Sequence, residues 1–361
     1  MAVIRADKLG KAYDGKPAVI DLSFMVNPGS VTGFLGPNGS GKSTTMRLML
    51  GLDNGSGVAT FDGKPFRELV QPMRQVGALL EAKPFHPTRT ARNHLRMLAS
   101  ANGIQTSRVD EVLAMVGLAT VSNGKPKKFS LGMSQRLGVA AALLGDPHTL
   151  ILDEPANGLD PEGIQWLRNL LKQLASQGRA VFVSSHLLSE MALLADQLVV
   201  IGRGRMIASG PVGDFIKSSD RNSVVIRSPD MDRLGPRLAD LGGLVDAIAD
   251  DTASTDTGMA RYSVKRLSVE QVGDAAHDIA ARVHELFLKE ATLEEAFLDA
   301  TGGAEEFSGL GSQSPGTPSE ASSSPSADLG PAYSPAPTVR PADKPPQETD
   351  LPQTHEDGSG R

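Results

Sequence analysis

Short apolar runs alternate with longer helical patterns in the first part of the chain, from Val3 to about Lys217. Five of these runs are predicted to be β-strands: VTGFL, VGALL, TLILD, AVFVS and QLVVIG. Several have consecutive apolar residues rather than an apolar and polar alternation, which is typical of strands covered on both faces. The pattern therefore predicts an α/β fold with a largely parallel sheet.

The pattern changes after residue 217. Strands are predicted at residues 222–227, 260–264 and 282–288, and helices at residues 234–241 and 269–281. A further helix is predicted at residues 292–300, because Thr292 can cap its start and Glu295 follows three residues later. We interpret residues 1–217 as one domain and residues 218–300 as a small α/β accessory domain that this helix closes.

Residues 301–361 are rich in serine, proline, glycine and alanine. The segment SPGTPSEASSSPSADLGPAYSPAPT has too few large apolar side chains to offset the entropy of ordering. We predict that this tail is disordered.

Composition narrows the possible functions. The 361 residues include no cysteine, which excludes disulfides and thiolate metal sites. The formal net charge is −6 and basic residues form no block, so a nucleic-acid partner is not expected. Charged residues at Arg5, Asp7 and Lys8 argue against a signal peptide. Apolar runs such as 137–145 are too short to span a bilayer, so we expect no membrane crossing by this chain.

A glycine-rich loop follows the predicted strand VTGFL. Its residues are Gly36, Pro37, Asn38, Gly39, Ser40, Gly41, Lys42, Ser43 and Thr44. In the order strand, loop and helix, this pattern predicts a phosphate loop whose backbone N–H groups surround the phosphates of ATP. Lys42 would reach the β- and γ-phosphates, and the Ser43 hydroxyl would coordinate Mg²⁺.

A second acidic element lies at the end of the predicted strand TLILD. Asp153 and Glu154 would stand at the carboxyl edge of the sheet, where ligands of open α/β sheets bind. Asp153 suits the outer shell of Mg²⁺, and Glu154 suits polarising the water that attacks the γ-phosphate. Taken alone, the pair could equally be the solvated start of a loop.

The segment FSLGMSQRLGVA, residues 129–140, completes an ordered series of motifs. With Ser130, Gly132, Gln135 and Arg136 in place between the phosphate loop and TLILD, the chain resembles the ATP-binding-cassette (ABC) superfamily. The resemblance covers about residues 1–217. It implies the ABC type of phosphate-loop NTPase domain, with a helical subdomain.

The resemblance also implies roles for residues whose types alone are weak evidence. Tyr13 would stack on adenine, residues 157–160 (NGLD) would form the loop after the strand, and His186 would contact the γ-phosphate. ABC ATPases work as head-to-tail dimers, so Ser130 and Gly132 would contact the γ-phosphate bound by the partner chain. We therefore expect a homodimer with two ATP molecules at its interface.

Three positions depart from the common ABC pattern. Leu131 replaces the first signature glycine and Met133 the signature glutamine. We expect the contact of Ser130 and Gly132 with the γ-phosphate to survive, although a Cβ at residue 131 narrows the allowed backbone dihedrals. Glu81 stands where most of the superfamily has glutamine. A carboxylate can approach Mg²⁺ but cannot donate an N–H, so Glu81 is a further candidate metal ligand.

Glu81, the SLGM segment and the closing TLEEAFL together resemble the ATPase subunits of exporters of the daunorubicin and bacitracin resistance types. This resemblance implies an ATPase that powers drug or antibiotic export through a separate transmembrane permease, at the cytoplasmic face of the membrane. The alternative is an ABC-type ATPase that acts on ribosomes or nucleic acid, which usually carries two cassettes, a long insertion or basic arms. A purely regulatory ATP-binding module would lack Glu154 or His186, and both are present. The sequence leaves open the cargo, the direction of transport, the permease and the role of residues 218–300.

Overall fold

The computed structural model describes residues 3–80, 85–86, 88–248 and 260–300. The tail at residues 301–361 and the candidate metal ligand Glu81 lie outside these ranges. Within them, no helix combines the length and the apolar character that a membrane span requires.

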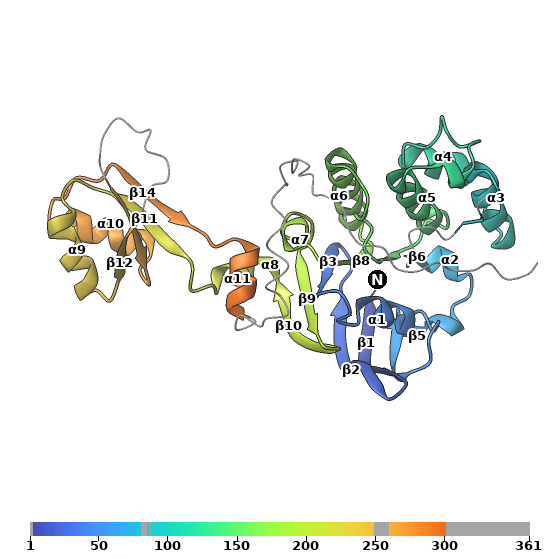
Figure 1. The fold of residues 1–361 in the computed structure, drawn as a ribbon, viewed down its shortest axis with the longest axis horizontal. Coiled ribbons are helices and arrows are strands. Elements are labelled where there is room, and N and C mark those ends of the chain that lie inside the picture. The colour runs from blue at the N-terminus through green and yellow to red at the C-terminus, as the bar shows by residue number, and fades with distance from the viewer. Residues whose placement is uncertain (1–2, 81–84, 87, 249–259, 301–361) are drawn as a thin grey trace, which may run out of the picture. The chain divides into compact units, whose positions relative to one another are not determined.

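A six-stranded sheet forms the centre of the N-terminal part of the chain (Figure 1). Its strands in spatial order are β10 (Arg205–Pro211), β9 (Gln197–Gly202), β3 (Ser30–Leu35), β8 (Ala180–Ser185), β7 (Thr149–Leu152) and β6 (Val76–Leu79). All neighbours are parallel except β10 and β9. Every residue of β7 and β8 is buried, as their continuous apolar runs predict.

A second, antiparallel sheet precedes and flanks the phosphate loop in the sequence. It consists of β2 (Lys16–Val26), β1 (Ile4–Tyr13), β4 (Ser56–Phe61) and β5 (Lys64–Pro65), in that order. The sequence analysis predicts a largely parallel sheet and does not predict this second sheet. The two sheets share a hydrophobic cluster in which the rings of Phe24, Phe34 and Phe182 lie 5.0–5.7 Å apart, centre to centre.

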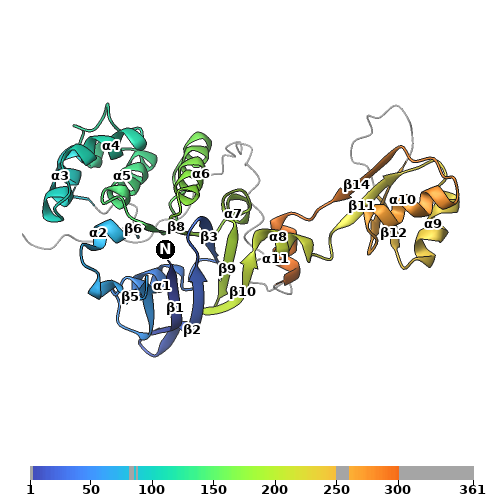
Figure 2. The ribbon, with the colours of Figure 1, turned by 180° about the vertical axis from the view of Figure 1, so that it is seen from behind.

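The helices of the N-terminal part of the chain pack against the parallel sheet and against one another. They are α1 (Lys42–Met49), α2 (Pro72–Gln75), α3 (Ala91–Ala101), α4 (Ser107–Met115), α5 (Leu131–Leu143), α6 (Pro161–Ser176), α7 (Leu188–Leu194) and α8 (Val212–Lys217), with short 3₁₀ turns at Phe66–Glu68 and Pro126–Lys128. Helices α3, α4 and α5 pack side by side in both views (Figures 1 and 2). Their apolar residues join those of α6 and α7 in one cluster against the sheet.

A third sheet lies in the region after residue 217. Its strands in order are β12 (Leu244–Ile248), β13 (Arg261–Lys265), β11 (Ser223–Arg227) and β14 (Glu285–Lys289), and all of its pairs are antiparallel. Helices α9 (Met231–Asp240) and α10 (Val269–Asp278) pack with it around a separate hydrophobic cluster. Strand β12, which the sequence pattern does not predict, has no fully buried residue.

Helix α11 (Leu293–Ala300) begins with the expected reciprocal cap. The Glu295 N–H donates to Thr292 Oγ1 at 3.2 Å, and the Thr292 N–H donates to Glu295 Oε2 at 2.8 Å. We expect this helix to close the accessory domain, but its buried Leu293 and Phe297 belong to the cluster built from α3–α7, and it contacts α7 and α8. The apolar face of the helix therefore completes the N-terminal core.

Candidate nucleotide-binding site

Three loops meet at one edge of the parallel sheet. In the strand register Leu35 lies opposite Ser185, and Leu152 lies opposite Val183. Because β3, β7 and β8 run parallel, the segments that follow them leave the sheet at the same edge. The phosphate loop, the Asp153 and Glu154 pair, and His186 are thereby brought together.

The phosphate loop has the backbone shape that its glycines permit. Gly39 and Gly41 have φ angles of 81° and 107°, and a Cβ on Gly41 would lie only 2.5 Å from the Ala18 carbonyl oxygen. A cavity of about 210 Å³ is lined by Ala18, Asn38, Gly39, Gly41, Lys42, Ser43, Thr44 and Glu154. Helix α1 begins at Lys42, so its first N–H groups lie beside this cavity. The Ser40 hydroxyl is buried and has no hydrogen-bond partner among the described residues.

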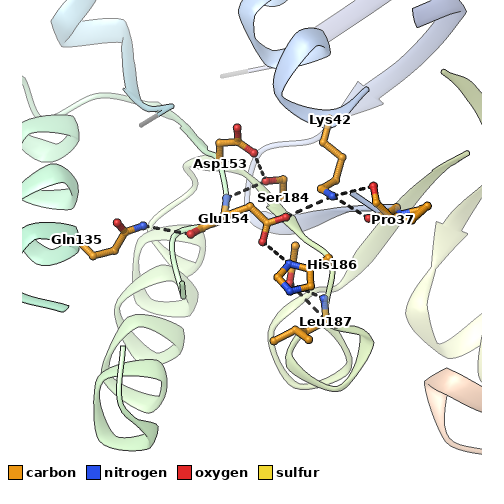
Figure 3. A network of polar contacts seen from close by, with 10 residues as sticks. Pro37, Lys42, Gln135, Asp153, Glu154, Ser184, His186 and Leu187 are labelled. Carbon is orange, nitrogen blue, oxygen red and sulfur yellow. Dashed lines mark hydrogen bonds and ion pairs between the residues drawn. The ribbon is translucent and has the colours of Figure 1, made fainter. Parts of the chain in front are cut away.

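The ammonium group of Lys42 is buried and lies within this loop. It donates to the carbonyl oxygens of Gly36 at 2.7 Å and Pro37 at 3.3 Å. Its Nζ also lies 3.3 Å from Glu154 Oε1, which is an ion pair. A single cation thus joins the phosphate loop to the acidic end of β7 (Figure 3).

The two predicted catalytic residues are in direct contact. His186 Nδ1 lies 2.9 Å from Glu154 Oε2, while the other carboxylate oxygen faces Lys42 (Figure 3). The structure therefore places the carboxylate of Glu154 between the lysine of the phosphate loop and the histidine that follows β8. An imidazole can donate to this carboxylate or accept from a protonated neighbour, so the pair is suited to proton handling.

Asp153 is held by a residue that the sequence analysis assigns no role. The Ser184 hydroxyl donates to Asp153 Oδ1 at 2.5 Å and accepts from the Glu154 N–H at 2.8 Å. Ser184 is fully buried at the end of β8. A hydroxyl at the end of an otherwise apolar strand next to TLILD is the signal that could have identified it.

The signature residues begin α5. The Ser130 hydroxyl accepts from the Met133 N–H at 3.1 Å and caps the helix. One turn further on, Gln135 Nε2 donates to the Glu154 carbonyl oxygen at 3.1 Å. The sequence pattern identifies Gln135 only as a motif residue and does not predict this contact with Glu154.

The atoms around Gly132 and Gly158 show how the Leu131 side chain is accommodated at the start of α5. A Cβ on Gly158 would lie 2.1 Å from Leu131 Cδ2, so the Leu131 side chain covers the NGLD segment. A Cβ on Gly132 would lie 3.2 Å from the Gly158 carbonyl oxygen, so this end of the helix approaches NGLD closely. The Leu131 side chain remains 45% exposed, so a second copy of the chain could contact it.

Tyr13, the expected adenine contact, ends β1 and is held from two sides. Its hydroxyl donates to Asp53 Oδ2 at 2.8 Å, and Lys11 Nζ lies 4.8 Å from its ring centre. Arg47 of α1 makes a bidentate contact with Asp53. The bond to Asp53 raises the pKa of the Tyr13 phenol, while the bond from Arg47, followed by that from Tyr13, lowers the pKa of Asp53.

Comparisons with known proteins place this geometry in a family. A family model described as ABC transporter matches residues 19–157, and one described as a domain of unknown function matches residues 222–294. The uncharacterized ABC transporter ATP-binding protein YhcH of Bacillus subtilis (strain 168) is 35% identical over 309 residues, which cover 84% of this chain and 97% of YhcH. The chain belongs to the ABC transporter ATP-binding proteins.

Two further similarities agree with this membership. The bacitracin transport ATP-binding protein BcrA of Bacillus licheniformis is 38% identical over 235 residues, or 64% of this chain and 76% of BcrA. A solved structure described as the ATP binding subunit of an ABC transporter matches with a TM-score of 0.55 and 27% identity, over 60% of this chain and 92% of that one. The predicted fold class, with an ABC ATPase domain, is confirmed.

Family membership also settles the general function. The chain is the nucleotide-binding ATPase subunit of an ABC transporter, and the alternative of an ABC-type ATPase acting on ribosomes or nucleic acid is not supported. In this chain Lys42 of the phosphate loop, Glu154 and His186 lie in one cluster. The roles of the individual residues are proposals, and they follow.

Proposed function

We propose that Glu154 is the general base for hydrolysis of Mg²⁺-bound ATP. The observation that carries this proposal is the position of its carboxylate between Lys42 Nζ, at 3.3 Å, and His186 Nδ1, at 2.9 Å. Glu154 would accept a proton from water as the water oxygen bonds to the γ-phosphorus. The bond from that phosphorus to the bridging oxygen then breaks, giving ADP and phosphate. Lys42 would bind the phosphates, and His186 would orient the γ-phosphate and the base.

The residues beside Glu154 fit a magnesium ion and a triphosphate. Ser43 lines the cavity at the start of α1, and Asp153 directly follows β7. The buried Ser40 hydroxyl and the free first N–H groups of α1 suit phosphate oxygens. We propose that Ser43 and Asp153 hold Mg²⁺, which would neutralise developing charge on the phosphates. The metal role of Glu81 stays a prediction.

The remaining site residues support a nucleotide shared between two chains. In this proposal, Tyr13 stacks on adenine in one chain, while Ser130 and Gly132 of the other chain contact the γ-phosphate. The half-exposed Leu131 at the start of α5 is consistent with such a contact surface. ATP would then link two copies head to tail, and hydrolysis would release them.

We propose that this cycle powers export through a separate permease, with the ATPase held at the cytoplasmic face of the membrane. The supporting observations are the family and the similarity to the bacitracin transport ATP-binding protein BcrA. The cargo class that this similarity favours is a peptide antibiotic. Selection of the cargo would rest with the permease.

We also propose two folding units in the described chain. Residues 223–289 form one, because the hydrophobic cluster of this region has no member from the first 217 residues. Helix α11 belongs to the other through Leu293 and Phe297. The Asn222 side chain joins the two segments that connect these units, since its Nδ2 donates to the Ile216 carbonyl of α8 at 2.7 Å and its Oδ1 accepts from the Ala291 N–H, after β14, at 2.7 Å.

The test of the catalytic proposal is ATP hydrolysis by the purified full chain with and without Mg²⁺. Chelation of Mg²⁺ should abolish turnover. Glu154→Gln should lower kcat by about 100-fold or more while ATP binding, measured by equilibrium dialysis, persists. Glu111→Gln, at an exposed carboxylate of α4, is the matched control and should keep the parent rate. A Glu154→Gln variant that hydrolyses ATP at the parent rate would exclude Glu154 as the base.

A further inference from the structure

The backbone of Glu154 has an unusual conformation and is fixed at both of its polar groups. Its φ angle of 48° lies in the left-handed region, which disfavours a glutamate. Its N–H donates to the Ser184 hydroxyl at 2.8 Å, and its carbonyl oxygen accepts from Gln135 Nε2 at 3.1 Å. Strained backbone of this kind persists only where its surroundings hold it. Two side chains from different elements therefore maintain the conformation (Figure 3).

Ser184 fixes both acidic residues through one oxygen atom. The hydroxyl accepts from the Glu154 N–H and donates to Asp153 Oδ1, so a residue of β8 constrains the orientation of both acidic residues. The neighbouring register pair, Leu152 opposite Val183, brings Ser184 next to this segment. Ser184 is 0% exposed, which shields both bonds from competition with water.

Gln135 fixes the carbonyl side and connects it to the signature helix. Its side chain is 1% exposed, and its Oε1 has no hydrogen-bond partner among the residues that the structure describes. A buried amide with an unsatisfied oxygen is costly, so its orientation toward Glu154 is a specific arrangement. Gln135 lies five residues after Ser130 on the rigid helix α5.

We propose that Ser184 and Gln135 are positioning residues for Glu154. They act through its backbone and aim its carboxylate at Lys42 and His186. Through Gln135, a displacement of α5 at Ser130 is transmitted to the base, so engagement of the signature loop in one site tunes hydrolysis in the other. This inference rests on the proposed role of Glu154 as base and of Ser130 as a contact to the partner's nucleotide.

The test for Ser184 uses the full chain and separates kcat from KM. Ser184→Ala removes both bonds and should lower kcat by about tenfold to a hundredfold, because a small misplacement of a reacting group has effects of this size. KM for ATP should change by less than about twofold, since Ser184 is not among the residues that line the cavity at the phosphate loop. Ser184→Thr keeps the hydroxyl that makes both bonds. This variant should retain most of the activity.

The control for loss of a buried hydroxyl is Ser122→Ala. Ser122 is also buried, and its hydroxyl donates to the Ala119 carbonyl and accepts from Arg92. It belongs to the segment that joins α4 to α5 in the sequence, and its hydroxyl makes no bond to Glu154. This variant should lose stability without a change in kcat. Parent kcat in Ser184→Ala, or equal loss in Ser184→Ala and Ser184→Thr, would overturn the role of Ser184.

The test for Gln135 is Gln135→Met, which keeps length and burial but removes the donor. We expect a fall in kcat of about tenfold at unchanged KM, and a lower Hill coefficient for ATP, because α5 no longer reaches the base. Unchanged kcat and Hill coefficient, or loss of ATP binding together with activity, would overturn the role of Gln135. If Glu154→Gln is inactive while these variants behave as the parent, the inference fails alone. If Glu154→Gln is fully active, the proposed function fails with it.

Discussion

At the residue scale, the site depends on the carboxylate of Glu154, which faces the ammonium group of Lys42 and the imidazole of His186. One carboxylate oxygen of Glu154 contacts Lys42 Nζ, and the other contacts His186 Nδ1. In the proposed cycle, phosphate oxygens would compete with Glu154 for Lys42. Lys42 would then bind the phosphates of ATP, and the Glu154 carboxylate, no longer paired with Lys42, would accept a proton from water.

Tyr13 gives a residue-scale prediction about nucleotide affinity. If its ring stacks on adenine, Tyr13→Ala should raise KM for ATP by about tenfold at nearly unchanged kcat, since base stacking on an aromatic ring contributes about 1–3 kcal/mol. Tyr13→Phe keeps the ring but loses the bond to Asp53, so it should have an intermediate KM. Steady-state kinetics with Tyr13→Trp as a restoring control measures this, and a parent KM in Tyr13→Ala would contradict the stacking role.

The sequence predicts the main site residues because their motifs combine residue type with position. Lys42, Asp153, Glu154 and His186 follow predicted strands, and parallel strands bring such positions to one edge. The contacts of Ser184, and of Gln135 to the Glu154 carbonyl, depend on side-chain rotamers and strand register. No pattern of apolar and polar positions specifies those two quantities.

At the element scale, α11 shows how an amphipathic helix can be predicted correctly and assigned to the wrong core. The capping pair Thr292 and Glu295 fixes where it begins. Its apolar stripe says only that one face is buried, and Leu293 and Phe297 pack with α7 and α8. The antiparallel sheet of β1, β2, β4 and β5 was missed for a similar reason, since partners of a strand are not visible in its own pattern.

Phe297→Ala tests the placement of α11. Phe297 is 1% exposed, so we expect a loss of about 3–5 kcal/mol in the free energy of unfolding of the N-terminal core. Hydrogen exchange should show reduced amide protection in α7, with β11 unchanged. Phe287→Ala, at a residue of β14 that is 47% exposed, is the matched control and should change stability by less than about 0.5 kcal/mol. Unchanged protection of α7 in Phe297→Ala would contradict the assignment.

The accessory region supplies a prediction about pH. Arg282 donates to Asp230 through its backbone N–H, Nε and Nη2, and these contacts lower the pKa of Asp230 to about 2 from its ordinary value of 3.8. A carboxylate with a lowered folded-state pKa stabilises the fold above the unfolded-state value, and this stabilisation is lost as the pH falls from about 4 to about 2. Asp230→Asn should therefore be less stable than the parent near neutral pH, and the difference should shrink over that interval.

Urea unfolding at several pH values, followed by hydrogen exchange in α10, measures this difference. Asp232→Asn removes a neighbouring exposed carboxylate outside the ion pair and serves as the control. A stability difference between Asp230→Asn and the parent that stays constant down to pH ~2 would show that the ion pair does not contribute in this way.

At the scale of the whole molecule, the proposed second folding unit, residues 223–289, has its own hydrophobic cluster. The Asn222 side chain joins α8 to the segment after β14, and α11 contacts α7, which follows His186. The fold class could be predicted from the apolar runs and the ordered motifs. The packing of α11 with the N-terminal core could not, because it depends on a few long-range contacts.

If this ATPase powers a separate membrane permease, as proposed, the two proteins should form a stable complex. Tagged full-length Glu154→Gln should be purified with ATP and Mg²⁺ from gently solubilised membranes of its own cells, with untagged cells as the control, and its partners identified by mass spectrometry. We expect one polytopic membrane protein in stoichiometric amount, together with a dimer of the ATPase. Recovery of ribosomal proteins, or of the ATPase without any membrane protein, would contradict this proposal.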